Sequence, residues 1–110
     1  MKNLIHYLNE KELHFKVLES IEPKELNSRK KMGIYHSVTL DSSYYAIFIV
    51  ESKSRFLRKN ANDLMTMLEV LKSYKSHNYK YKMLIISSPL CSKAKALLEE
   101  DGWRVENDWS

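Results

Sequence analysis

The stretch YYAIFIVESK, residues 44–53, decides the fold of this chain. Its first seven residues are aromatic or β-branched apart from one alanine, a composition typical of β-strands. The run Ala46–Val50 is apolar at every position, so we expect a strand that is covered on both faces and central in its sheet. Directly after this run the chain becomes polar, with Glu51, Ser52 and Lys53.

The residues before this stretch predict a hairpin. Gly33–Leu40 favours a strand, and Asp41, Ser42 and Ser43 are residue types that favour turns. We therefore expect strands over residues 33–40 and 44–51 to pair in antiparallel orientation. With a turn centred near Ser42 and Ser43, Glu51 would lie opposite about Ile34.

The C-terminal half predicts a βαβ crossover. An apolar stripe at helical spacing predicts a helix over residues 60–74, capped by Asn60 or Asn62. Residues 82–87 predict a buried strand, Ser88 and Pro89 a helix start, Gly102 a helix end, and residues 103–105 a last strand. The fold class is therefore α/β, a small mixed β-sheet made of an antiparallel hairpin and a βαβ crossover, flanked by helices.

The N-terminal segment predicts a helix over residues 3–20. Leu4, Leu8, Phe15 and Leu18 recur at helical spacing, and Pro23 ends the pattern. A short strand over residues 14–18 is the alternative. The polar residues 22–31 predict a loop.

Composition indicates one globular domain spanning residues 1–110. Hydrophobic residues make up 44% and charged residues 29%, and the formal net charge of +4 suits an anionic partner. The single cysteine, Cys91, excludes an intramolecular disulfide and a cysteine-rich zinc site. No apolar run reaches the roughly 18 residues of a membrane span, and the N-terminus does not resemble a signal peptide. We expect a cytoplasmic protein without a membrane partner.

The charged end of the central strand suggests chemistry on phosphates. Side chains two apart on a strand share a face, so Glu51 and Lys53 would point into one site. A carboxylate there can bind Mg²⁺, which activates water and stabilises charge on a phosphate. A nearby lysine can position or deprotonate that water.

This pattern resembles the E-x-K strand of the PD-(D/E)XK nuclease superfamily. Residues 33–107 follow its element order, and Ser87, Ser88 and Pro89 leading into residues 93–103 are similar to the archaeal mismatch-directed endonuclease branch. The likeness to archaeal Holliday-junction resolvases is looser. The resemblance implies a restriction endonuclease-like core and a metal-dependent nuclease that hydrolyses DNA rather than RNA, with Mg²⁺ or Mn²⁺ as cofactor.

The second metal ligand is the open question in this resemblance. The family's first metal-binding aspartate precedes E-x-K on the neighbouring strand, and Asp41 is the nearest aspartate in sequence. The implied catalytic set is Glu51, Lys53 and Asp41, and the implied metal ligands are Glu51, Asp41 and His36. The hairpin argues against Asp41, because a turn residue would lie roughly 25 Å from Glu51. Either the turn lies elsewhere, or the site is altered or inactive.

Two basic clusters flank the hairpin and predict nucleic-acid contacts. One precedes it and the other follows the E-x-K motif, and both approach one end of the sheet. Their residues are Arg29, Lys30, Lys31, Arg55, Arg58 and Lys59.

Three readings of function stay open at this stage. The first is the metal-dependent nuclease, and the second is an inactive module on the same fold that binds nucleic acid or a protein partner. The third is a metal-independent RNA cleaver using Tyr35, His36 and Lys82, which is weaker because adjacent strand residues face opposite sides. A homodimer is compatible with all three.

Overall fold

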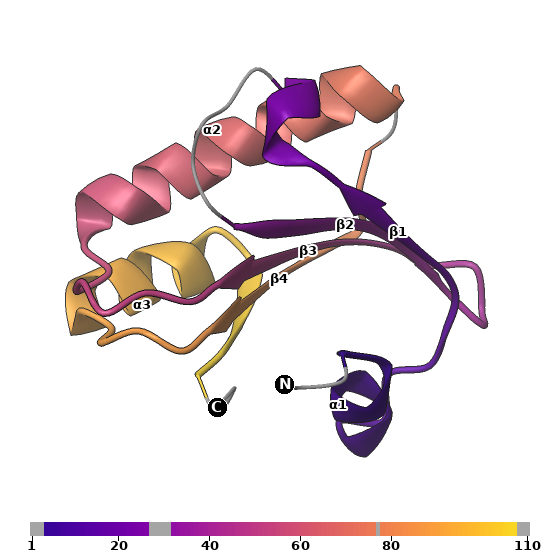
Figure 1. Ribbon diagram of the computed structural model, residues 1–110, viewed down its shortest axis with the longest axis horizontal. Helices are drawn as coiled ribbons and strands as arrows, with labels where there is room; N and C mark the ends of the chain where they lie inside the picture. Colours follow the sequence, from indigo (N-terminus) through magenta and orange to yellow (C-terminus); the bar gives the residue numbers. More distant parts are fainter. Residues whose placement is uncertain (1–3, 27–31, 77, 108–110) are drawn as a thin grey trace.

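A computed structural model of the chain shows a sheet with helices on both faces (Figure 1). It describes residues 4–26, 32–76 and 78–107. The elements are α1 (Leu4–Glu10), β1 (Phe15–Ile21), a 3-10 turn η1 (Pro23–Leu26), β2 (Gly33–Thr39), β3 (Tyr44–Val50), α2 (Arg58–Lys75), β4 (Tyr81–Ile86), α3 (Ser92–Glu100) and β5 (Trp103–Glu106). The α/β fold class is confirmed.

The five strands lie in sequence order across one mixed sheet. β1, β2 and β3 pair in antiparallel orientation, whereas β3, β4 and β5 run parallel. The carboxyl ends of β3, β4 and β5 therefore meet at one end of the sheet, together with the amino end of β2. We call this the carboxyl end, and the opposite one, which holds the hairpin turn, the amino end.

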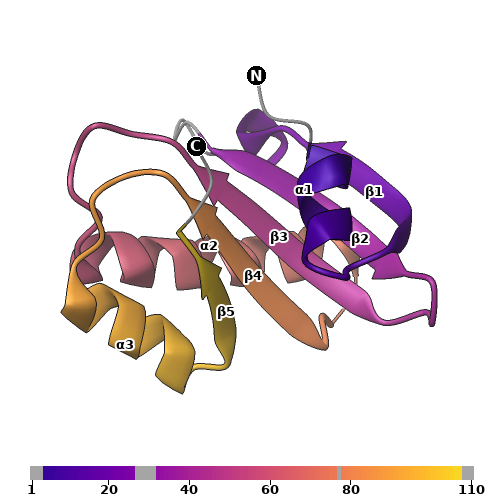
Figure 2. The same ribbon diagram turned by 90° about the horizontal axis from the view of Figure 1, so that it is seen from below.

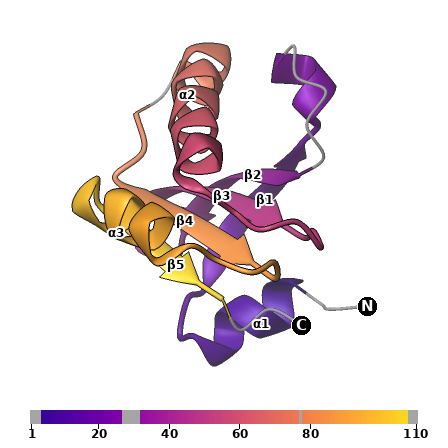
Figure 3. The ribbon, with the colours of Figure 1, turned by 90° about the vertical axis from the view of Figure 1, so that its left-hand side faces the viewer.

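The central strand β3 separates two apolar cores, as its sequence predicts. Ala46 and Phe48 pack in the core beneath α2 and α3, while Ile47 and Ile49 pack on the other face with α1. Figures 2 and 3 show the two longer helices together on one face and α1 on the other. Burying each large side chain of this strand contributes about 1.5–3 kcal/mol, so covering both faces holds β3 in the middle.

The N-terminal helix is shorter than its sequence pattern predicts. α1 ends at Glu10, and Glu12 adopts a left-handed conformation with φ of 62° that turns the chain into β1. β1 contains a bulge between Phe15 and Val17. The extra residue places Phe15 and Leu18 on the same core although they are three apart, the spacing of a helix. The helix over residues 3–20 is therefore wrong, and the strand alternative is the observed structure.

A buried polar pair lies between the sheet and the end of α2. His36 in β2 is 7% exposed, and its Nδ1 lies 2.7 Å from the Tyr79 hydroxyl, with which it shares a hydrogen bond. The Tyr44 ring lies beside the His36 ring at 6.1 Å between centroids. Burial, with a smaller contribution from the charge of Glu19, raises the pKa of Tyr79 to about 12.

Replacing Tyr79 tests this burial through the pH dependence of stability. Tyr79 is protonated in both states below its unfolded pKa of about 10, so its stabilising contribution is fully present there. The contribution is lost as pH rises from about 10 through the folded pKa of about 12. Two pKa units correspond to roughly 2.7 kcal/mol, and partial solvation reduces this to about 1–2 kcal/mol.

Urea unfolding between about pH 9 and pH 12 measures the effect. The free energy of unfolding should fall more steeply with pH in the wild type than in Tyr79→Phe, which has no ionisable group at this position. Parallel curves for the two proteins would show that Tyr79 is not held in its neutral form.

Candidate nucleic-acid interface

Two loops lie side by side at the carboxyl end of the sheet. The loop after β3 and the loop after β4 are joined where Ser87 N–H donates to the Val50 carbonyl at 3.0 Å. Farther out, Phe56 N–H donates to the Pro89 carbonyl at 2.7 Å and Cys91 N–H donates to the Phe56 carbonyl at 3.0 Å. These backbone bonds hold Phe56 against Leu90 as a parallel bridge, so the two loops form one surface.

This bridge displaces the predicted start of α3. Ser88 and Pro89 predict a helix cap, but α3 begins at Ser92 with Cys91 at the N-cap position. Because the Pro89 carbonyl and the residues around Leu90 pair with Phe56, that segment is extended and the helix begins later. The side chain of Ser88 is therefore not used as a cap. The predicted end of the helix is confirmed, since Gly102 follows it with φ of 86°.

The start of α2 carries positive charge where a helix least tolerates it. α2 begins at Arg58, two residues earlier than predicted, with Leu57 as N-cap. Asn60 is not the cap; its Oδ1 accepts a hydrogen bond from Leu57 N–H at 2.9 Å. No side chain caps the helix and no acidic residue lies in its first turn, which holds Arg58 and Lys59. The helix dipole places partial positive charge at this end, so both cations are unfavourable there.

A pocket of about 230 Å³ lies between the two loops and the first turns of α2. Its walls are partly apolar and partly polar, and they come from the residue before β2, the end of β3, both loops and α2. The lining residues are Met32, Val50, Ser52, Ser54, Arg55, Phe56, Asn60, Asp63, Leu64 and Ser88. Ser88 is 9% exposed, and its buried Oγ has no hydrogen-bond partner within the described part of the chain.

Glu51 and Lys53 lie in the loop at the same end of the sheet. β3 ends at Val50, one residue earlier than predicted, and both side chains are exposed. Neither makes a hydrogen bond or ion pair to another residue in the described ranges. Because the strand ends before Glu51, strand alternation no longer imposes a shared face on the two side chains. Their convergence on one site stays a prediction.

Asp41 lies at the amino end of the sheet, far from Glu51. Its carboxylate accepts a hydrogen bond from the Thr39 hydroxyl and one from Ser43 N–H at 3.3 Å, and these bonds lower its pKa. The seven residues of β3 separate it from Glu51, which corresponds to roughly 20 Å or more. The register also differs from the prediction, because Ile34 lies opposite Phe48 and not opposite Glu51.

The three predicted metal ligands are thus not brought together. Asp41 lies in the turn, Glu51 in the loop after β3, and His36 is buried in the middle of β2 beside Tyr79. Across residues 4–26, 32–76 and 78–107, no group of three or more His, Cys, Asp and Glu side chains could hold a metal ion. These residues therefore do not fit an Mg²⁺ or Mn²⁺ site, which needs several oxygen ligands. The predicted contacts Arg29, Lys30 and Lys31 lie outside the described residues.

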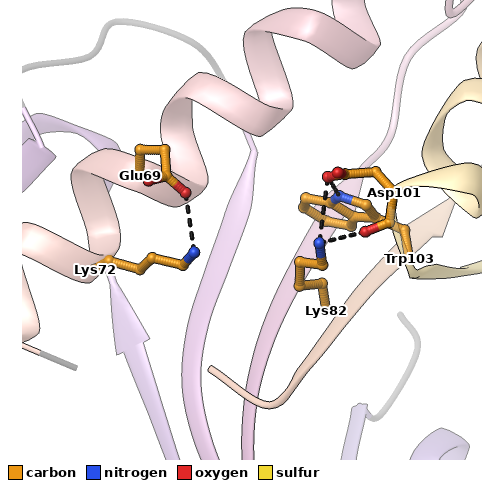
Figure 4. Close-up of polar contacts among 5 residues, drawn as sticks. All are labelled: Glu69, Lys72, Lys82, Asp101 and Trp103. Atoms are coloured by element: carbon orange, nitrogen blue, oxygen red, sulfur yellow. Dashed lines mark hydrogen bonds and ion pairs between the residues drawn. The ribbon is translucent and has the colours of Figure 1, made fainter. Parts of the chain in front are cut away.

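The residues of a metal-independent RNA cleaver do not converge either. Tyr35 packs with the α1 core, whereas His36 is bonded to Tyr79 beneath α2. Figure 4 shows Lys82 Nζ donating to the Asp101 carbonyl and paired with the Asp101 carboxylate, at 3.2 Å for the latter. The figure also shows a separate ion pair on α2, at 3.0 Å between Lys72 and Glu69. Lys82 thus serves to tie the start of β4 to the turn before β5.

Comparison with known proteins identifies the fold. No family model matches the sequence, and no curated protein does. Among solved structures, EndoMS in its apo form superposes with a TM-score of 0.56 at 14% identity, covering 97% of this chain and 47% of that one. A repair endonuclease from Pyrococcus abyssi gives 0.54 at 18% identity, covering 93% and 43%. EndoMS in a complex with double-stranded DNA gives 0.51 at 15%, covering 96% and 43%.

These likenesses show that the chain shares its fold with the solved repair endonucleases, and they confirm the restriction endonuclease-like core predicted from the element order. The chain spans less than half the length of each of these solved chains. Within the described residues, no helix combines the length and the apolar character needed to cross a membrane.

Reversing the charge at the start of α2 should stabilise the protein. Arg58→Glu replaces an unfavourable cation by an anion that the helix dipole favours, so the free energy of unfolding should rise by about 0.3–1 kcal/mol at low salt. Arg55→Glu, in the loop outside the helix, is the matched control and should change stability less. Urea unfolding of both variants measures this, and a destabilised Arg58→Glu would contradict the electrostatic account.

Proposed function

We propose that this chain is a nucleic-acid-binding domain of nuclease fold that contacts the phosphate backbone through its carboxyl end. The observation that carries the proposal is the pair Arg58 and Lys59 in the first turn of α2, with no acidic residue or side-chain cap to offset them. Such an arrangement destabilises the free helix, and a bound anion removes the penalty.

The surrounding surface supports an extended anionic partner. Arg55 is exposed in the loop that leads into α2, and Lys53 is exposed in the same loop. Within the described ranges, neither makes an ion pair. Several cations without ion-pair partners among the described residues lie at one end of the sheet. Such a surface suits a polymer of phosphates better than a single small anion, because each contact with a phosphate releases a counterion.

We propose DNA as the partner, and the reason for this choice is the shared fold. One of the solved structures with this fold is a complex of EndoMS with double-stranded DNA. For this function we propose a location inside the cell. We further propose that the domain works as a homodimer when it engages two strands.

Phosphodiester hydrolysis at Glu51 and Lys53 is the second candidate function. Its support is that both side chains are exposed, lack partners among the described residues and lie in the loop that carries Arg55. A carboxylate can accept a proton from water, and an ammonium group can stabilise charge on a phosphate. The resemblance to PD-(D/E)XK nucleases implies Mg²⁺ or Mn²⁺, but Glu51 is one carboxylate where such a site needs more, so no step is assigned to a metal.

Charge reversal at the carboxyl end tests binding. Arg58→Glu combined with Lys59→Glu should weaken binding of a short DNA duplex by at least about tenfold near 50 mM salt, and should reduce the slope of log K against log salt by about two. Lys16→Glu combined with Lys80→Glu, at two exposed lysines on β1 and before β4, is the control with the same change in net charge. Fluorescence anisotropy measures both, and equal losses in the two proteins would show non-specific attraction to a basic protein.

Removing the Glu51 carboxylate tests hydrolysis. If Glu51 acts in cleavage, Glu51→Gln should lower the rate by roughly 10²-fold or more while duplex affinity stays the same or rises. Glu99→Gln, an exposed carboxylate on α3, is the control. The assay uses wild-type protein with Mg²⁺, with Mn²⁺ and with chelator on single-stranded, duplex and branched DNA. Binding without cleavage in every condition would remove this candidate and leave the binding domain.

A further inference from the structure

We propose that Leu57 acts as a wedge, inserting its side chain between two stacked base pairs of the bound duplex. This inference rests on the proposed nucleic-acid function and adds to it a way in which the carboxyl end distinguishes one DNA site from another. Leu57 is the residue before α2, in the same segment as Arg55, Arg58 and Lys59. All four side chains are exposed, so an apolar side chain lies within the run of cations proposed to contact phosphates.

The Leu57 side chain serves neither the core nor the helix. It is 46% exposed, and it is not among the described residues that pack in either core. Its backbone has φ of −109° and ψ of 174° at the N-cap position, where serine, threonine, asparagine or aspartate would accept a hydrogen bond from a helix N–H. A leucine cannot accept that bond, so neither burial nor capping accounts for this residue.

The backbone around Leu57 is held by hydrogen bonds on both sides. Leu57 N–H donates to Asn60 Oδ1 at 2.9 Å, and the Leu57 carbonyl accepts from Ala61 N–H at 3.0 Å. The preceding residue, Phe56, is buried and bridged to Leu90. An exposed side chain on a fixed backbone is pre-organised, so it loses little conformational entropy when it enters a binding site.

The cations beside Leu57 favour DNA over a protein as the surface that receives it. The cores of protein interfaces are poor in charged residues, and a protein partner would have to cover Arg55 and Arg58 to reach Leu57. A duplex instead pairs its phosphates with these cations and presents a groove between its strands. Leucine is one of the apolar residues that proteins insert between base steps, where it buries surface against the bases and kinks the duplex.

A wedge gives the binding surface a preference for DNA sequence. Pyrimidine–purine steps such as TA open easily, whereas A-tracts are stiff. The chain should therefore bind a duplex with a central TA step more tightly than an A-tract duplex of equal length and charge. Contacts to phosphates carry no sequence information directly.

Fluorescence of 2-aminopurine, which rises when this base leaves the stack, tests the proposal. The base is placed next to the central TA step of a short duplex, and the full chain is added to saturation. Fluorescence should rise with the wild type and with Leu57→Met, which keeps a long apolar side chain, and should not rise with Leu57→Ala. The affinity of Leu57→Ala for this duplex should fall by about three- to tenfold.

Val70→Ala is the matched control. Val70 is an apolar residue of α2 that is 37% exposed, and it lies roughly 18 Å along the helix axis from Arg58. This variant should behave as the wild type does. An equal fluorescence rise with saturating Leu57→Ala, or no rise with wild-type protein that binds the duplex, would overturn the wedge.

Leu57→Ser separates the wedge from a structural role. Serine supplies the missing cap, so the free energy of unfolding measured in urea should increase while the fluorescence rise is lost. A leucine with only a structural role would give the opposite result, a destabilised variant that still opens the TA step when bound.

Failure of this inference is distinguishable from failure of the proposed function. If duplex DNA binds and depends on Arg58 and Lys59 while the 2-aminopurine signal does not change, the wedge is wrong and the function stands. If the duplex does not bind, both are wrong.

Discussion

The burial of β3 on both faces is the constraint on which the rest of the structure depends. A strand with Ile47 and Ile49 in one core and Ala46 and Phe48 in the other requires cover on each side, which α1 provides on one face and α2 with α3 on the other. Helical connections allow β4 and β5 to lie parallel to it, so the carboxyl ends of three strands meet. The surface proposed for nucleic acid is a consequence of this arrangement, because the loops that leave β3 and β4 emerge side by side.

Stability and the proposed binding of nucleic acid compete at the start of α2. The helix supplies much of the core through Leu64, Leu68 and Leu71, and that burial is strong enough to tolerate Arg58 and Lys59 at the wrong end of the dipole. A protein selected only for stability would place acidic residues in that turn. The uncompensated cations are unfavourable in the free protein. A phosphate bound at this end of the helix would offset that penalty.

The sequence predicts those parts of the fold that depend on apolar patterning. β3, the hairpin, the βαβ crossover and the glycine at the end of α3 all follow from periodicity or residue type. The N-terminal prediction is wrong because a bulge in β1 gives Phe15 and Leu18 helical spacing on a strand. The cap predictions are wrong because Asn60 and Ser88 have the right chemistry for capping but lie where tertiary contacts place them elsewhere. The pairing of Phe56 with Leu90, which shapes the pocket, cannot be predicted from the local sequence. The site prediction places Glu51, Lys53 and Arg55 at one end of the sheet, but Asp41 lies at the other because the hairpin extends between them.

The measurement that tests the central claim most directly is a map of backbone amide shifts as a short DNA duplex is added to the ¹⁵N-labelled chain. The account predicts that the shifted signals cluster at the carboxyl end, in residues 51–60 and 87–91, and that they return toward their free positions as salt is raised from about 50 to 200 mM. Shifts centred on the amino end, around the hairpin turn at residues 40–43 and the loop before β4, would contradict it. A spectrum that does not change with DNA would contradict it as well.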